Sequence, residues 1–339
     1  MATIYAGPGK LVFGGAVFWP QQENGQLVYR IDQQKQDFAN SMFGRVGSTL
    51  GGTIGKITVT PFDNWSAIPV LYPQFLGVSS AGAGALQIGT RPHNVNGGAD
   101  VVGKIWNPSG LLISVNRLAI TRHPDMHLGV GKPLFGQVEL TALPSIAIGL
   151  AVETLNSFHA ITENGAADPG ITFITADFVR EAWTGVWGTA PGFGGDGGAA
   201  IQAEDEWTIS CSAKYDEMKV QEQTLAMKLS SVEFMAKVRP YGPTWTQINT
   251  QVMTGRKLGS RFGNPGTQGA QANLSLTSAS SGKIITLENC DVQTEGFEFG
   301  GARLTTGEIG FVTQLVPANQ LIAPPGQSGV QNLVNISFP

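Results

Sequence analysis

The same strand pattern occurs twice in this chain, at corresponding places in its two halves. Residues 136–143 read GQVELTAL and residues 307–315 read GEIGFVTQL, and both segments alternate polar with apolar side chains. A period of two is typical of a β-strand with one buried face. Each segment ends a longer series of similar strands, and this repeated order constrains the possible folds most.

The first series contains strands, one long polar stretch and one short helix. Residues 32–53 are polar and rich in Gly and Ser, and we predict that they form a long hairpin loop. A short helix is predicted over residues 65–72, because Trp65, Ile68 and Leu71 are three residues apart. The predicted strands are residues 11–18, 25–31, 57–60, 100–106, 111–120 and 134–143.

The second series has the same order, displaced by about 180 residues at its start and about 172 at its end. Tyr29 corresponds to Ile209, Pro61 to Pro240, and Leu143 to Leu315. The predicted elements are strands at residues 207–213, 231–238, 283–293 and 307–315, a polar stretch at 214–224, a helix at 243–253 and a Gly-rich loop at 255–269. A repeated series of this length indicates an internal duplication.

The duplication predicts a mainly β protein of two tandem modules. Each module is expected to be a small sandwich or open barrel with one short flanking α-helix. The first module is placed at residues 1–143, and the second module with a C-terminal arm at residues 206–339. Residues 144–205 are predicted to connect them, with a helix at residues 176–188 and a flexible Gly-rich loop at 191–198.

The composition indicates a surface that is covered by partners. Only 14% of the residues are charged, against about 25% in an ordinary soluble protein. The net charge of −4 gives no general attraction to nucleic acid or acidic lipid. No apolar run reaches the roughly 18 residues of a membrane-spanning helix, and the first residues lack a signal-peptide core. We therefore expect synthesis in a cytoplasm.

The sequence contains no convincing catalytic or cofactor motif, so we expect neither an enzyme nor a cofactor. Gly192, Gly194 and Gly197 satisfy GxGxxG, but they follow a predicted helix rather than the strand that this motif requires. The best metal candidates are His123, Asp125 and His127, which would share one face of a strand. The alternative is a polar turn at this place, interrupted by Pro124.

Several segments of the chain resemble the tail tube (major tail) proteins of long-tailed bacteriophages. They are FGRVGSTLGGTIGKITVTPFDNW, KPLFGQVELTAL and the later series WTISC, SVEFMAKVRP and GFVTQL. The resemblance implies subunits of two packed sheets with a flanking helix, joined edge to edge into a ring with a β-barrel inner wall. Stacked rings would form the hollow tube through which the genome leaves.

The resemblance also implies a hairpin loop that reaches the neighbouring ring. By rank, this loop corresponds to residues 32–53 in the first module and 214–224 in the second. The candidate inter-ring residues are Gln36, Phe38, Met42, Phe43, Arg45, Tyr215 and Met218. Family rings usually hold six single modules, so a duplicated chain is expected to form a homotrimeric, pseudo-sixfold ring.

The expected partners are other copies of this chain and the tape-measure, tail-terminator and tail-tip proteins that the family implies. Genome DNA would pass through the lumen without specific binding, so few of the 21 Lys and Arg side chains should line the bore unpaired. The expected location is the virion tail, assembled in the host cytoplasm.

Two other classes remain open from the sequence. A capsid decoration or baseplate protein would also be β-rich and duplicated, but it would not polymerise into tubes. A carbohydrate-binding β module or glycan-active enzyme would need an exposed aromatic platform or a carboxylate pair. Its platform could draw on Trp183, Trp187, Trp207 or Trp245, although the sequence favours core packing for these residues several-fold.

Overall fold

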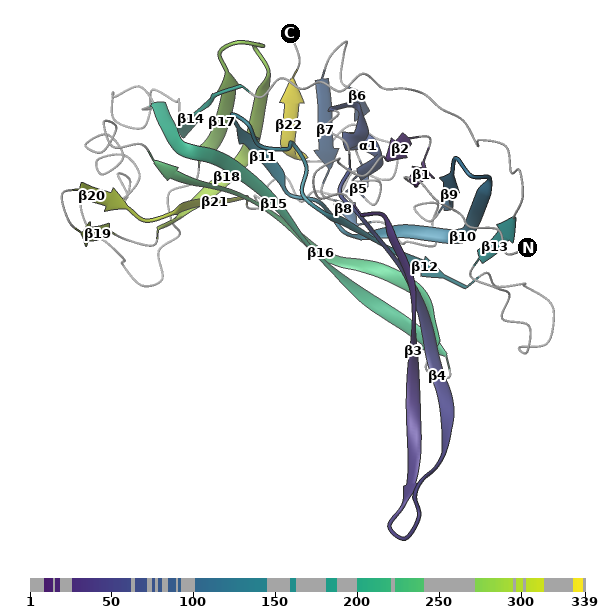
Figure 1. Cartoon of the computed structure of the whole chain (residues 1–339). Coiled ribbons are helices and arrows are strands. Elements are labelled where there is room, and N and C mark those ends of the chain that lie inside the picture. Colours follow the sequence, from purple (N-terminus) through teal and green to yellow (C-terminus); the bar gives the residue numbers. More distant parts are fainter. Residues whose placement is uncertain are drawn as a thin grey trace.

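The computed structural model shows an elongated β-sheet body from which a long β-hairpin projects (Figure 1). The mainly β fold that the sequence predicts is confirmed, and every described strand pair is antiparallel. The structure describes residues 9–14, 16–18, 26–61, 65–71, 75–76, 79–80, 85–89, 91–92, 101–144, 159–162, 181–187, 200–220, 223–240, 272–294, 297–300, 303–313 and 332–337.

The first sheet is built from the N-terminal half of the chain. Its order is β2 (Ala16–Phe18), β1 (Lys10–Phe13), β9 (Val101–Asn107), β10 (Leu111–Arg122), β12 (Val138–Leu143), β4 (Gly44–Val59) and β3 (Val28–Asn40). A further strand, β13 (His159–Thr162), pairs with β10. The two ends of this sheet, β2 and β3, are consecutive along the chain.

The second sheet is built mainly from the C-terminal half. Its order begins with β17 (Ala272–Ser278), β14 (Trp183–Trp187), β15 (Ala200–Val220), β16 (Gln223–Pro240), β21 (Ile309–Thr313), β18 (Ile284–Thr294) and β22 (Asn332–Ser337). Because β17 also pairs with β18, the strands from β17 to β18 close into a barrel.

The two sheets share one strand order. In the first, the β3–β4 hairpin is followed by β12, β10 and β9; in the second, the β15–β16 hairpin is followed by β21, β18 and β17. The registers of the two sheets correspond as well. Four successive pairs of the first sheet are Tyr29↔Ile57, Leu140↔Ile57, Ile120↔Leu140 and Val115↔Gly103. Their counterparts in the second sheet, in the same order, are Ile209↔Ala236, Phe311↔Ala236, Val292↔Phe311 and Leu287↔Leu274. Strand β13 lies on β10 as β22 lies on β18, since Val115↔His159 corresponds to Leu287↔Val334.

Three strands of the N-terminal half add to the second sheet. Strand β11 (Met126–Gly129) pairs with β15, and β7 (Ala85–Gly89) pairs with β22 and with β6 (Ser79–Ser80). Two small ladders complete the described strands, β5 (Phe75–Leu76) with β8 (Arg91–Pro92) and β19 (Phe297–Gly300) with β20 (Arg303–Thr306). The two halves are therefore joined by shared sheet as well as by the chain.

One hydrophobic core runs through both halves. The Trp65 and Trp183 rings lie 6.0 Å apart, and Trp207 lies 6.0 Å from Phe311. Trp183, Trp187 and Trp207 are all buried, so they form core contacts rather than an exposed sugar-binding platform. Trp245 lies outside the described residues.

A short helical segment contributes side chains to the shared core. It consists of the 3-10 helix η1 (Trp65–Ala67) and the helix α1 (Ile68–Leu71), and Trp65, Ile68 and Leu71 are buried as their spacing predicts. None of the helices in the described ranges has the length and hydropathy needed to cross a membrane. The predicted helix at residues 243–253 and the Gly-rich loops at 191–198 and 255–269 lie outside the described residues.

Two predictions from the sequence are wrong. The expected helix at residues 176–188 is strand β14 where it is described, because Trp183, Gly185 and Trp187 are buried in alternation with two partly exposed residues. The expected loops at residues 32–53 and 214–224, the latter described at 214–220 and 223–224, are instead hydrogen-bonded hairpin strands that continue β3–β4 and β15–β16. Their outer parts have solvent on both faces, so no apolar alternation marks them as strands.

Candidate functional site

The first hairpin projects from the body as an arm, which we call the first arm (β3–β4). Every described side chain from Arg30 to Thr49 is exposed. The turn at its end is fixed by Asn40, whose backbone oxygen accepts from the Phe43 amide at 3.3 Å and whose side-chain Oδ1 accepts from the Met42 amide at 2.8 Å. Asn is suited to such turns because its side chain bonds the backbone two residues on.

The end of the first arm carries large apolar side chains that contact nothing in the chain's core. Met42 is 82% exposed and Phe43 is 80% exposed, and Phe38 and Val46 are also exposed. We call these four residues the arm tip. A cluster of exposed apolar side chains on an arm is typical of an interaction site, since leaving it in water is unfavourable.

The charged residues of the first arm are paired close to the tip. The Arg45 guanidinium lies 2.8 Å from the Asp37 carboxylate across the two strands, with both side chains exposed. Cross-strand pairs of this kind hold the register of an exposed ladder weakly. Gln36 precedes Asp37 on β3 and pairs with Thr49, and its side chain is outside the described part. Val46 is not among the predicted inter-ring residues, although it is the one large apolar residue between Phe43 and Leu50.

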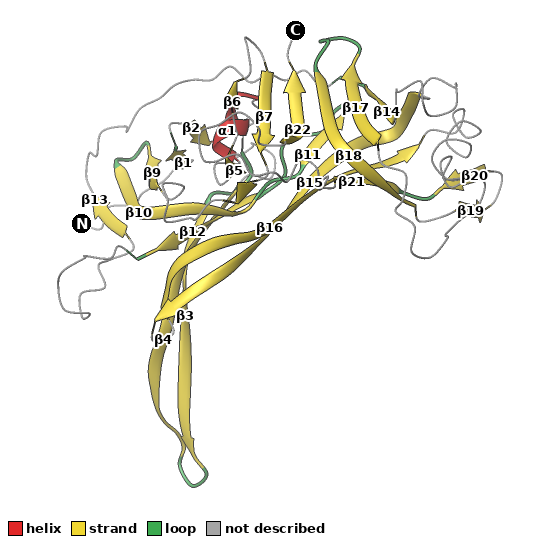
Figure 2. Ribbon diagram, turned by 180° about the vertical axis from the view of Figure 1, so that it is seen from behind, coloured by secondary structure: helices red, strands yellow, loops and turns green. Residues whose placement is uncertain are grey.

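The second hairpin (β15–β16) projects to the same side of the body as the first arm, as both views show (Figures 1 and 2). Its end carries the exposed Met218 and an ion pair of 3.0 Å between Lys219 and Glu217. The Lys219 hydrogen bond, with a further bond from Thr224, lowers the pKa of Glu217. Met218 is thus exposed at the end of this hairpin, and its inter-ring contact stays a prediction.

Tyr215 is placed differently from the prediction. It is half-buried, and with Met227 it packs against Ala119 and Leu143 of the first sheet. Its hydroxyl lies 3.0 Å from His123 Nε2 and 3.2 Å from the Ile120 carbonyl oxygen. Tyr215 therefore holds the second hairpin onto the first sheet and is not available at a hairpin end.

The three candidate metal ligands do not form a metal site. His123 is buried and uses both ring nitrogens, since Nδ1 lies 2.8 Å from the Leu71 carbonyl oxygen and Nε2 faces Tyr215. His127 Nδ1 instead lies 3.2 Å from the Glu206 carboxylate. Within the described ranges, which include Asp125, no group of three His, Cys, Asp or Glu residues could hold a metal ion. Residues 123–125 form the turn between β10 and β11.

His123 makes the stability of the chain dependent on pH. Burial lowers its pKa to about 4, although the bond to the Leu71 carbonyl opposes this shift. The unfolded chain, with a pKa of about 6.5, then binds more protons at pH 5, so stability is complete above about pH 6.5 and falls as the pH drops toward 4. We expect a loss of about 2 kcal/mol between pH 7.5 and 5 from this group.

Urea unfolding of the wild type and of His123→Gln at both pH values measures this contribution. The wild type should lose about 2 kcal/mol more than the variant over this interval, whatever their difference at pH 7.5. Equal pH dependence in the two proteins would show that His123 titrates normally.

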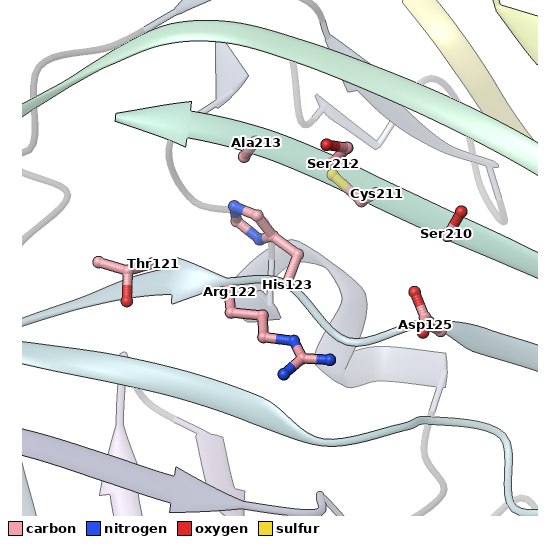
Figure 3. A pocket seen from close by; sticks show the side chains of 8 residues that line it. All are labelled: Thr121, Arg122, His123, Asp125, Ser210, Cys211, Ser212 and Ala213. Atoms are coloured by element: carbon pink, nitrogen blue, oxygen red, sulfur yellow. The ribbon is translucent and has the colours of Figure 1, made fainter. Parts of the chain in front are cut away.

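A pocket of about 290 Å³ lies beside His123, between the end of β10 and strand β15 (Figure 3). The His123 ring is turned toward β15, and the Arg122 side chain is turned away from it. Burial raises the pKa of the Cys211 thiol, which makes it unreactive at neutral pH. The lining residues are Thr121, Arg122, His123, Asp125, Ser210, Cys211, Ser212 and Ala213. The pocket therefore offers no activated nucleophile.

Comparison with known proteins finds no family model and no curated protein that matches this chain.

Proposed function

We propose that this chain is the tail tube subunit of a long-tailed bacteriophage. Three chains would form a pseudo-sixfold ring, and stacked rings would form the hollow tube that conducts DNA during ejection. The observation that carries this proposal is the repeated strand order with corresponding registers, together with two hairpins that project to one side of the body. The chain is then a structural virion protein without enzymatic activity.

The matching registers support an internal duplication. Unrelated sheets have no reason to agree in register at four successive strand pairs, because a slip of one residue would reverse the faces of a strand. The agreement extends to one irregularity. The β9–β10 ladder of the first sheet and the β17–β18 ladder of the second both shift register, and they do so at corresponding places. In this proposal β13 closes the first module and β14 opens the second, so the connection is shorter than residues 144–205.

The placement of the hairpins supports stacking. Both project to the same side, so one face of a ring would carry every hairpin end toward the next ring (Figure 2). Each chain would present the arm tip from its first module and Met218 from its second. The apolar side chains at these ends would lose their water only when the next ring docks.

The charge pattern supports a conduit for DNA. Lys56 pairs with Glu139 at 3.1 Å, Lys132 with Asp205 at 3.0 Å, and Lys237 with Glu308 at 2.7 Å. A paired lysine binds phosphate less well, because it must first give up its carboxylate partner. A net charge of −4 also opposes retention of the duplex.

Negative-stain electron microscopy of the purified chain over a range of concentrations tests the proposal. We expect hollow tubes above a critical concentration and smaller particles below it. Closed shells, or decoration of a capsid surface without tubes, would instead assign the chain to another part of the virion. Particles that remain monomeric at every concentration and bind glycans would contradict both virion assignments.

A further inference from the structure

The in-chain joint between the two halves suggests how one chain joins the next. We propose that β19 of one copy pairs, antiparallel, with the start of β3 and the two residues before it in a second copy, so that residues 297–300 lie opposite residues 26–29. The proposal rests on the proposed function, because it supplies the contact that closes the ring. It is carried by three sets of backbone pairings.

The first set is the joint already present within the chain. Strand β11 adds to the edge of β15 that β16 leaves free, with Met126↔Ile209, His127↔Thr208, Leu128↔Trp207 and Gly129↔Glu206. On its other side, β11 is bridged to the following segment by Met126↔Phe135. One module thus attaches to the next through a four-residue strand.

The second set identifies β19 as the counterpart of β11. Phe297 follows Met126 by 171 residues, and Thr306 follows Phe135 by the same number. The pair Phe297↔Thr306 of β19 and β20 therefore corresponds to the bridge Met126↔Phe135. Among the described residues, however, β19 has β20 as its only strand partner. The second module carries the same attaching strand, and no described strand receives it.

The third set identifies the start of β3 as the counterpart of the β15 edge. Tyr29 pairs with Ile57 as Ile209 pairs with Ala236, which aligns residues 26–29 with residues 206–209. In the described part of the chain, β4 is the only strand that pairs with β3. In the second module this edge receives β11. In the first module the corresponding edge of β3 has no described strand on it, and Val28 at this edge is 41% exposed.

Strand β13 of the first module is also uncovered, whereas its counterpart β22 in the second module is covered. Ile336 of β22 is fully buried, and β22 is covered at its edge by β7. Its counterpart on β13, Ile161, pairs with Ile113 as Ile336 pairs with Ile285, yet Ile161 is 54% exposed. The position that β22 buries within the chain is thus exposed on β13. A second copy of the chain could cover it there.

The position of these strands suits a head-to-tail contact. The β19–β20 hairpin lies at one end of the body, well apart from β3 of the same chain, so β19 would meet a β3 edge only on another copy (Figure 1). A contact between unlike surfaces generates a ring when its rotation closes. Applied three times, the β19–β3 joint and the β11–β15 joint would alternate around the ring.

Cysteine cross-linking tests this register. Val28→Cys combined with Glu298→Cys places two thiols at directly opposite positions of the proposed ladder. Opposite Cα atoms in antiparallel strands are about 4.5–5.5 Å apart, which is within the range of a disulfide. Under mild oxidation with copper–phenanthroline at assembling concentration, we expect covalent dimers and trimers on a non-reducing gel.

Matched variants test whether cross-linking depends on the register of the ladder and whether the native cysteines take part in it. His127→Cys with Thr208→Cys is the corresponding in-chain pair and should close within one chain without joining copies. Val28→Cys with Phe299→Cys is one residue out of register, so its thiols point to opposite faces and should cross-link at least tenfold less. Each single variant reports any reaction of Cys211 or Cys290.

Failure of this joint is distinguishable from failure of the proposed function. Rings or tubes that assemble without the Val28–Glu298 cross-link would overturn the joint and leave the tube assignment standing. Efficient cross-linking of the out-of-register pair would also overturn it. A chain that neither assembles nor cross-links at any concentration would contradict both proposals.

Discussion

Replacing Met42 and Phe43 of the arm tip together by serine is expected to weaken tube formation strongly while leaving the subunit folded. Both side chains are at least 80% exposed in the chain. Burying one large apolar side chain contributes about 1.5–3 kcal/mol, so losing two removes about 3–6 kcal/mol from each ring contact. The critical concentration for assembly should rise at least about 100-fold, measured by sedimentation of polymer across a dilution series.

The control for this variant is another exposed apolar side chain. Val102 on β9 is 52% exposed and lies away from both hairpins, so Val102→Ser should change the critical concentration less than about threefold. The thermal midpoint of the arm-tip variant should stay within about 2 °C of the wild type, because the tip makes no core contacts. Unchanged assembly of that variant would remove the first arm from the stacking contact.

Trp207→Ala is expected to lower the free energy of unfolding by about 3–5 kcal/mol, as for other fully buried tryptophans. The Trp207 ring is completely buried, packs on Phe311, and fills the space that Gly185 leaves on β14. It also lies opposite Leu128 at the joint between the halves. Equilibrium unfolding in urea, followed by fluorescence and by far-ultraviolet circular dichroism, measures the loss.

Two further variants examine the fit around Trp207. Trp207→Phe should cost clearly less than Trp207→Ala, because a ring remains in the space. Gly185→Ala should cost about 1–3 kcal/mol, since an added Cβ would lie 2.3 Å from Trp207 Cζ2, and the smaller Phe should relieve part of that cost. A loss below about 1 kcal/mol for Trp207→Ala would show that the halves do not share one rigid core at this place.

The alternation of side chains was sufficient to predict strands at residues 138–143 and 309–313, although the structure buries both faces of these strands rather than one. Leu140 and Phe311 were both placed in final strands of their series, and both are buried. The helical spacing of Trp65, Ile68 and Leu71 was informative for the same reason, because burial selects apolar residues at the period of the element.

Other parts could not be predicted because burial does not shape their sequence. The hairpin ends have water on both faces, so their strands read as polar loops. Strand β19 has only four residues, too few for a period to emerge, and its relation to β11 is visible only through register. Tyr215 looked like an outward residue, but its hydroxyl bonds to His123, which lies 92 positions earlier. Such distant pairings leave no local signal.

The most direct test of the tube assignment is a count of chains per ring in end-on averages from electron cryomicroscopy of the assembled protein. We predict three chains in a ring with a pseudo-sixfold wall, each chain contributing one segment from each half. The stacked rings should have hairpins reaching across every ring boundary. A wall made of six whole chains, or one with the C-terminal half outside it, would contradict the account.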